Sequence, residues 1–156
     1  MARNAGPARL LGLSDRVGSV AAALANGALG HALDYGDIFG AGPAHPSAAL
    51  VPALLALPDA DPDIDGGTLI PAMTAGTDLA CRLSIAPARA YEEGGWYFPP
   101  MVGTIATAAA CARLLGCDAA EVRDAMGLAL LQSSFPADPA PRPRRCSTER
   151  RYPIFQ

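Results

Sequence analysis

The sequence predicts an all-α fold, a helical bundle of about five main helices without a sheet. Apolar residues recur at helical spacing in five stretches, and no stretch shows the period-two alternation of a half-buried strand. Alanine, the strongest helix former, accounts for 33 of the 156 residues. Glycine- and proline-rich segments separate the five stretches and mark the connections between helices.

The first helix is expected over residues 17–33. Its apolar stripe, with the i, i+3, i+4 and i+7 spacing of an amphipathic helix, consists of Val17, Val20, Leu24, Ala28 and His31. Gly27 and Gly30 weaken the helix, so we expect each of them to allow close packing against a neighbour. Because His31 lies on the stripe, a hydrogen-bonded core histidine is the favoured interpretation of this residue.

Four further helices are expected. The second begins at residues 45–47, because proline is preorganised for the first helical position, and ends at Pro58. The third covers residues 68–85, the fourth covers residues 101–115, and the fifth opens with a capping box formed by Asp118 and Glu121. The apolar face of the third helix is expected to contain Leu69, Met73, Ala80 and Leu83. That of the fourth is expected to contain Val102, Ile105, Ala109, Ala112 and Leu115, and that of the fifth Val122, Met126, Ala129 and Leu130.

Three segments make up the expected domain organisation. Residues 1–16 form an N-terminal extension, residues 17–135 form the helical domain, and residues 136–156 form a Pro/Arg-rich tail that we expect to be disordered. The tail holds five of the fifteen prolines and five of the twelve arginines, and its net charge is +3 against −6 for residues 1–135. We favour a frameshifted or truncated reading frame over an evolved tail, and a basic arm for an acidic partner is the weaker functional interpretation.

Composition excludes several classes of protein. A net charge of −3 and a pI near 5.2 argue against nucleic-acid binding, and 51% apolar residues argue against a wholly disordered chain. The longest uncharged run, residues 17–33, contains Asn26 and His31, so no membrane span is expected. Four cysteines without C-x-x-C spacing suit buried thiols in a reducing cytoplasm, and we expect a cytoplasmic protein. All twelve basic residues are arginine, so any chemistry that needs a lysine must come from elsewhere.

The acidic segment 61–66 matches the first half of a calcium-binding loop, D-x-D-x-D-G. Such a loop needs a bidentate glutamate at its twelfth position, which here is Ala72. Aspartates also form turns, because their side chains bond the backbone locally. We therefore favour a turn and expect no metal site.

Both histidines of the chain lie in segments 30–37 and 44–48, with Asp34 and Asp37 between them. His45 is at the expected start of a helix, where free N–H groups and the helix dipole favour a bound anion. An imidazole in that place can hold a carboxylate or move a proton. A catalytic role for His45 and a purely structural one both stay open on this evidence.

Residues 94–100 place three consecutive aromatic side chains on a Gly/Pro hinge before a helix. They form either a plug that covers the core or a pocket wall in which Tyr97 presents a phenol donor. The spacing does not favour one over the other.

The sequence resembles the N-terminal helical domain of the MmgE/PrpD family across residues 18–133. The segments that carry the resemblance, in the order and spacing of the family, are residues 25–28, 31–35, 45–48, 52–57, 75–76, 80–83, 95–96, 103–104, 108–110, 114–116 and 125–129. The family includes lyases and an epimerase that act on small di- and tricarboxylates without a metal or organic cofactor. The resemblance thus implies a dehydratase or decarboxylase that needs no cofactor, and a homodimer.

The resemblance also implies site residues. Asp34 and His45 fall on the active-site aspartate and histidine of the family, and Tyr97 takes the place of a second histidine after Gly-Trp. We expect catalytic roles for Asp34, His45 and Tyr97, and substrate-binding roles for Asp37, Ser47 and Trp96.

The sequence also departs from the family pattern. The family motif D-[FY]-D-D-[ST] reads Asp34-Tyr35-Gly36-Asp37-Ile38 here, so one carboxylate and one hydroxyl are lost. Family chains are longer, and their catalytic lysines and lid domain lie in later parts. We therefore expect a truncated lyase, inactive alone, and the alternative is a non-catalytic helical module that binds a carboxylate or a protein partner.

Overall fold

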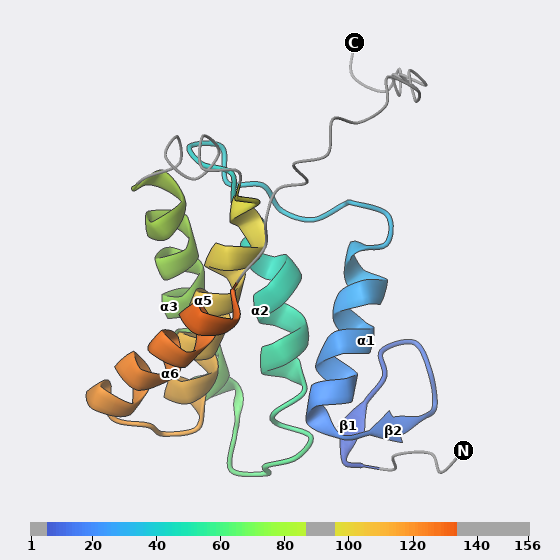
Figure 1. Ribbon diagram of the computed structural model, residues 1–156. Helices are drawn as coiled ribbons and strands as arrows, with labels where there is room; N and C mark the ends of the chain where they lie inside the picture. The colour runs from blue at the N-terminus through green and yellow to red at the C-terminus, as the bar shows by residue number, and fades with distance from the viewer. Residues whose placement is uncertain (1–5, 87–95, 134–156) are drawn as a thin grey trace.

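The structure is a computed structural model that describes residues 6–86 and 96–133 (Figure 1). The predicted tail, residues 136–156, lies outside the described residues. The elements are β1 (Ala8–Arg9), β2 (Arg16–Val17), α1 (Ser19–His31), α2 (Pro46–Leu55), α3 (Gly66–Ile85), α5 (Phe98–Leu114) and α6 (Ala119–Gln132). All five predicted helices are present, so the all-α prediction is confirmed, with helix ends within a few residues of those expected.

A two-stranded antiparallel sheet precedes the helices, and the expectation of no sheet misses it. β1 and β2 pair Ala8 with Val17 and Arg9 with Arg16, within and just beyond the segment expected to be an extension. Strands of two residues are too short to show a period-two pattern, which explains why the sequence did not reveal this hairpin.

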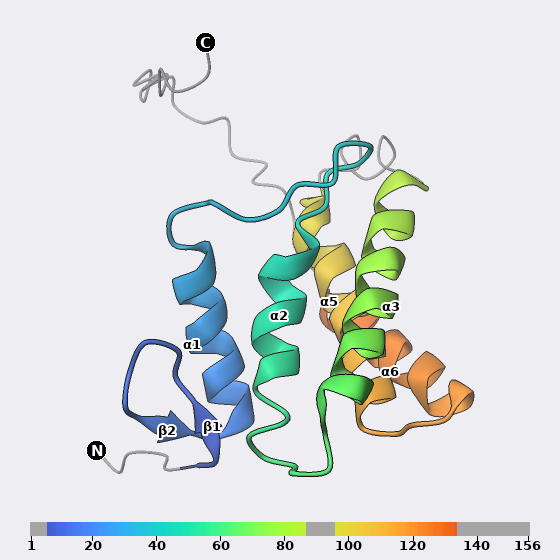
Figure 2. The same ribbon diagram turned by 180° about the vertical axis from the view of Figure 1, so that it is seen from behind.

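The helices form a bundle with α2 near its middle (Figures 1 and 2). α1 packs against one side of α2, α3 and α5 pack against the other, and α6 lies on α5. The main core, between α2, α3 and α5, consists of Leu50, Leu54, Ala72, Ala110 and Leu114. Glycine is required at position 76 of α3, because a Cβ there would lie 2.6 Å from Leu50 Cδ2 and 2.8 Å from Ala110 Cβ.

α1 turns its predicted apolar stripe away from the bundle, which corrects the expected packing. Val20 is 86% exposed and Leu24 is 76% exposed, and His31 is an exposed residue rather than a core histidine. The buried face is instead formed by Ala22 and Asn26. The physical reason is that, among the described helices, α1 packs mainly against α2, so its small residues fill that contact and its large ones stay exposed.

The two glycines of α1 differ in their surroundings. A Cβ on Gly27 would lie 3.4 Å from Pro52 Cγ of α2, so Gly27 does sit at a helix contact. Around Gly30 the corresponding space is open, so the expectation of close packing is wrong there.

α6 is attached to the bundle by one face only, and none of its residues is fully buried. Val122, Met126 and Ala129 are half-buried as the pattern suggested, but Leu130, expected to be buried, is 55% exposed. Leu115, expected on the apolar face of α5, is also exposed at 54%. Apolar faces therefore stand open on both α1 and α6.

Capping boxes fix the starts of two helices. At α6, Asp118 Oδ1 accepts from the Glu121 N–H at 2.9 Å and Glu121 returns the bond to the Asp118 N–H, which confirms the prediction. At α3, Asp65 and Thr68 form a second box that was not anticipated. Asp61 Oδ1 accepts from the Asp63 N–H at 3.1 Å, the local bonding of a turn.

Two side chains fasten the hairpin to the bundle. Asn26 of α1 accepts from the Leu11 N–H at 2.8 Å and donates to the Arg9 carbonyl at 3.0 Å. Asp59, after α2, accepts from the Arg9 backbone N–H at 2.8 Å and from the Arg9 guanidinium at 2.9 Å. These two hydrogen bonds from Arg9, the backbone one first, hold the pKa of Asp59 below its ordinary value of 3.8.

The cysteines within the described residues, Cys81, Cys111 and Cys117, are free and only half-buried, rather than fully buried as expected. Burial raises the pKa of Cys111 to about 11, which makes its thiol a poor nucleophile. Across the described ranges, no helix has both the length and the apolar character that crossing a bilayer requires.

The opposite environments of two leucines predict opposite outcomes of the same substitution. Leu54→Ala removes a side chain that is 0% exposed and should lower the free energy of unfolding by about 2–5 kcal/mol. Leu24→Ala, at a 76% exposed position, should change it by less than about 0.5 kcal/mol. Urea unfolding followed by circular dichroism measures both, and equal losses would contradict the orientation of α1.

Asp59→Asn should weaken the anchoring of the hairpin in a pH-dependent way. Because the folded-state pKa of Asp59 is lowered, its stabilising contribution is present above about pH 4 and is lost as the pH falls below that value. We expect a loss of up to about 1 kcal/mol at neutral pH and a smaller difference at about pH 3. Asp78→Asn is the matched control, since the ion pair that the described residues give Asp78 is with Arg82 of its own helix. A difference that persists at low pH would contradict the ionic origin.

Candidate functional site

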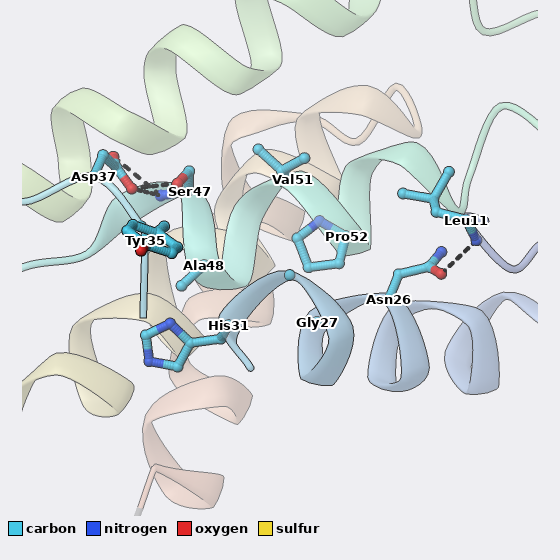
Figure 3. Close-up of a pocket in the computed structure, with 12 residues that line it drawn as sticks. Leu11, Asn26, Gly27, His31, Tyr35, Asp37, Ser47, Ala48, Val51 and Pro52 are labelled. Atoms are coloured by element: carbon cyan, nitrogen blue, oxygen red, sulfur yellow. Dashed lines mark hydrogen bonds between the residues drawn. The ribbon is translucent and has the colours of Figure 1, made fainter. Parts of the chain in front are cut away.

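Two adjoining clefts lie between α1, α2 and their neighbours. The hairpin cleft, of about 270 Å³, is drawn in Figure 3 and is lined by Leu11, Asn26, Gly27, Gly30, His31, Tyr35, Gly36, Asp37, Ser47, Ala48, Val51 and Pro52. The tyrosine cleft, of about 360 Å³, is lined by Gly27, Ala28, His31, His45, Ala48, Ala49, Tyr97, Pro99, Pro100 and Gly103. Gly27, His31 and Ala48 line both clefts, so the two share a wall.

His45 is the residue just before α2, and Pro46 at the first helical position fixes the start of the helix behind it. The imidazole is half-buried, and its Nδ1 lies 3.1 Å from the Asp37 carbonyl oxygen. A carbonyl oxygen can only accept, so Nδ1 carries the proton in this hydrogen bond. Neutral His45 then keeps the lone pair on Nε2, which is the form in which imidazole acts as a base.

Asp37 and Ser47, both predicted to bind substrate, are brought together by the structure but bind each other (Figure 3). The Asp37 carboxylate accepts from the Ser47 N–H at 3.1 Å and 3.3 Å and also from the Ser47 hydroxyl. We expected free N–H groups at the start of α2, whereas the N–H of Ser47 is already occupied by this carboxylate. Asp37 thus caps α2 from outside the helix, and its own carbonyl orients His45.

Asp34 lies where the chain leaves α1, in the left-handed conformation with φ of 56°, which aspartate tolerates better than most residues. Its side chain is 81% exposed and lines neither cleft. Asp34 Oδ1 lies 3.8 Å from His31 Nε2, the closest ionic contact that the described residues give it. The predicted catalytic aspartate therefore lies outside both clefts and is connected to them by its contact with His31.

His31 and His45 face each other although they come from different elements. Their ring centroids are 6.1 Å apart and their planes meet at 64°, an edge-on arrangement. His31, which its place on the apolar stripe predicted to be a core residue, lies instead in the wall of both clefts. A nearby signal was present in the sequence, since Asp34 follows His31 at the i+3 spacing of a helical ion pair.

The aromatic hinge is only partly a site element. Tyr97, just before α5, lines the tyrosine cleft together with His45 and is 56% exposed. Trp96 is 40% exposed and lines neither cleft, so the structure does not bring it to the other candidate residues. Phe98 is the aromatic side chain that enters the core, against Ala80 and Val102.

The charge of the site is unusual for an anion-binding pocket. Among the described residues, neither cleft has an arginine in its wall, and the chain has no lysine. Within the same ranges, no cluster of three or more His, Cys, Asp or Glu side chains could hold a metal ion. Positive charge in the described part of the site must therefore come from the two imidazoles.

These groups can bind, donate and accept protons within a small volume. His45 offers a base at Nε2, Tyr97 offers a phenol donor, and His31 offers a second imidazole beside a carboxylate. These three side chains suit proton transfer next to a carboxylate of a substrate, and further cationic groups would be needed to hold the negative charges of that substrate.

A family model and the individual relatives that match this chain point to the same protein family. A model of the MmgE/PrpD N-terminal domain matches residues 1–138. Cis-aconitate decarboxylase from Homo sapiens is 33% identical over 120 residues, covering 74% of this chain and 24% of that protein. The Mus musculus enzyme of the same name is 34% identical over the same shares, and the one from Aspergillus terreus is 29% identical over 82% of this chain and 27% of its own length.

The match of the family model spans both the helical bundle and the hairpin before it. The chain corresponds to about a quarter of the length of these relatives. By its matched residues and by its helical fold, the chain belongs to the MmgE/PrpD family, whose N-terminal domain it contains.

Proposed function

We propose that this chain provides the histidine half of the active site of a lyase that acts on a small di- or tricarboxylate without a cofactor. The chemistry would be dehydration or decarboxylation next to a carboxylate, as in 2-methylcitrate dehydratase or cis-aconitate decarboxylase. The observation that carries the proposal is the meeting of His45, His31 and Tyr97 in one cleft, from α1, α2 and the start of α5.

Elimination or decarboxylation beside a carboxylate needs a base, an acid and cationic groups for the charges of the substrate. The Nδ1 hydrogen bond to Asp37 supports His45 as the base, and the presence of Tyr97 in the wall of the same cleft supports a phenol as the acid. The names of the relatives support a carboxylate as substrate, since all three relatives reported above are named cis-aconitate decarboxylase.

The remaining groups would come from outside the described residues. The site lacks a lysine, and the arginines of the described residues lie away from both clefts. An open cleft also keeps water beside the reacting groups, which weakens every charge interaction. Because the chain covers about a quarter of its relatives, we propose that the missing cations and a lid belong to the remainder of such a protein.

A second candidate is a helical module that binds a protein partner. The exposed apolar side chains of α1 and α6 favour it, because unpaired apolar helix faces are typical of interaction surfaces. Under this alternative the clefts would have no ligand of their own, so carboxylate binding separates the two functions.

Carboxylate binding is expected in the tyrosine cleft. Isothermal titration at about pH 6, where imidazoles are substantially protonated, should show heat on addition of citrate or cis-aconitate. His45→Ala should weaken binding by about tenfold or more, the cost of about one charge-assisted hydrogen bond. The control is Arg123→Ala, which removes a positive charge from α6, a helix that lines neither cleft. Absence of binding, or equal loss in both variants, would contradict the proposal.

The isolated 156-residue chain should nevertheless show no turnover. It has a base and a donor but no lysine, and arginine is always protonated and so a poor base. Purified protein incubated with 2-methylcitrate or cis-aconitate should match the reaction without enzyme, followed by absorbance or by NMR of the product. Turnover that His45→Ala abolishes would overturn this prediction.

A further inference from the structure

His31 has the features of a ligand-binding residue. It ends α1 and lines both clefts, and its side chain is half exposed, so solvent and ligands can reach the ring. Its ring centroid lies 6.1 Å from that of His45, edge-on at 64°. A ligand in the tyrosine cleft therefore lies against both imidazoles.

The described residues around His31 leave one of its ring nitrogens available. Asp34 Oδ1 lies 3.8 Å from Nε2, Tyr35 and Asp37 share the hairpin cleft with the ring, and His45 and Tyr97 share the tyrosine cleft. Within the described residues, Nδ1 has no hydrogen-bond partner.

Gly36 keeps this nitrogen uncovered. A Cβ at position 36 would lie 3.9 Å from His31 Nδ1, so any larger side chain there would begin in contact with the ring.

We infer that His31 is a second substrate-binding imidazole, which holds one carboxylate of a ligand whose other carboxylate accepts a hydrogen bond from the Nε2–H of protonated His45. The base of the proposed reaction is the neutral form of that same ring. This inference rests on the proposed function and deepens it. Each imidazole reaches a carboxylate oxygen at a hydrogen-bond distance of about 2.8 Å, so two rings 6.1 Å apart accommodate a short dicarboxylate lying across them. The described residues that line the clefts include no arginine, the side chain that commonly holds a carboxylate. His31 would take over part of that binding role. Asp34 is a positioning residue that acts through His31.

The chain has only two histidines, so NMR of the imidazole ring resonances follows each one separately. Glutarate and glutaramate form a matched ligand pair, equal in length but with one carboxylate replaced by a neutral amide. In the wild-type protein, glutarate should shift both ring resonances with one common dissociation constant and bind about tenfold more tightly than glutaramate.

His31→Gln should abolish the preference for glutarate while leaving the affinity for glutaramate unchanged. Leu33→Gln is the matched control, since Leu33 is 78% exposed, lies two residues away and receives the same side chain. Leu33→Gln should keep the wild-type preference, and thermal melts should show that both variants fold.

Two results would overturn the role of His31 alone: an unchanged glutarate preference in His31→Gln, or an equal loss of affinity for both ligands, which indicates a structural role. In either case the proposed function survives as long as binding still depends on His45. If glutarate shifts neither ring resonance of the wild-type protein, both the inference and the proposed function fail.

Discussion

The Asp37 side chain and carbonyl together hold the site in place. Its carboxylate accepts from the N–H and hydroxyl of Ser47 at the start of α2, and its carbonyl accepts from His45 Nδ1. One residue of the α1–α2 connection thus caps the first turn of α2, sets which tautomer His45 adopts and ties the loop to the helix. The walls of both clefts depend on these bonds, because both include residues of the loop or of the first turn of α2.

The same bonds set the electrostatics of the site. A helix N-terminus usually attracts an external anion, but here the Asp37 carboxylate already accepts the Ser47 N–H. Among the described residues of the cleft walls, only His31 and His45 have side chains that can become cationic. Under the proposed function, such a site would need further cations from another part of a longer protein to hold a polycarboxylate firmly.

The sequence predicted the helices well because their signals are local. Asp118 and Glu121 mark the start of α6 through bonds between residues three apart, and Pro46 marks the start of α2 in the same way. The aspartates of the acidic loop were correctly interpreted as turn formers, although the Asp65–Thr68 box was not recognised. His45 and Tyr97 were predicted as site residues, and the structure places both in one cleft.

Packing direction could not be predicted in this way. The stripe from Val20 to His31 has the periodicity of a buried face, but periodicity identifies a face and not its neighbour. Which side of α1 meets α2 is decided by contacts distant in sequence, such as that of Gly27 with Pro52. Because this side of α1 meets α2, His31 is exposed and lies close to His45.

The Asn26 amide has a consequence beyond its own hydrogen bonds. It holds the backbone of Arg9 and Leu11, and Leu11 forms one end of the hairpin cleft, with the Asp37–Ser47 pair at the other end (Figure 3). Order in the hairpin and occupancy of the cleft are therefore thermodynamically linked. A ligand that contacts Leu11 would stabilise the hairpin, and a change that disorders the hairpin would weaken binding of that ligand by the same free energy. The hairpin of residues 8–17 thereby becomes part of the binding equilibrium.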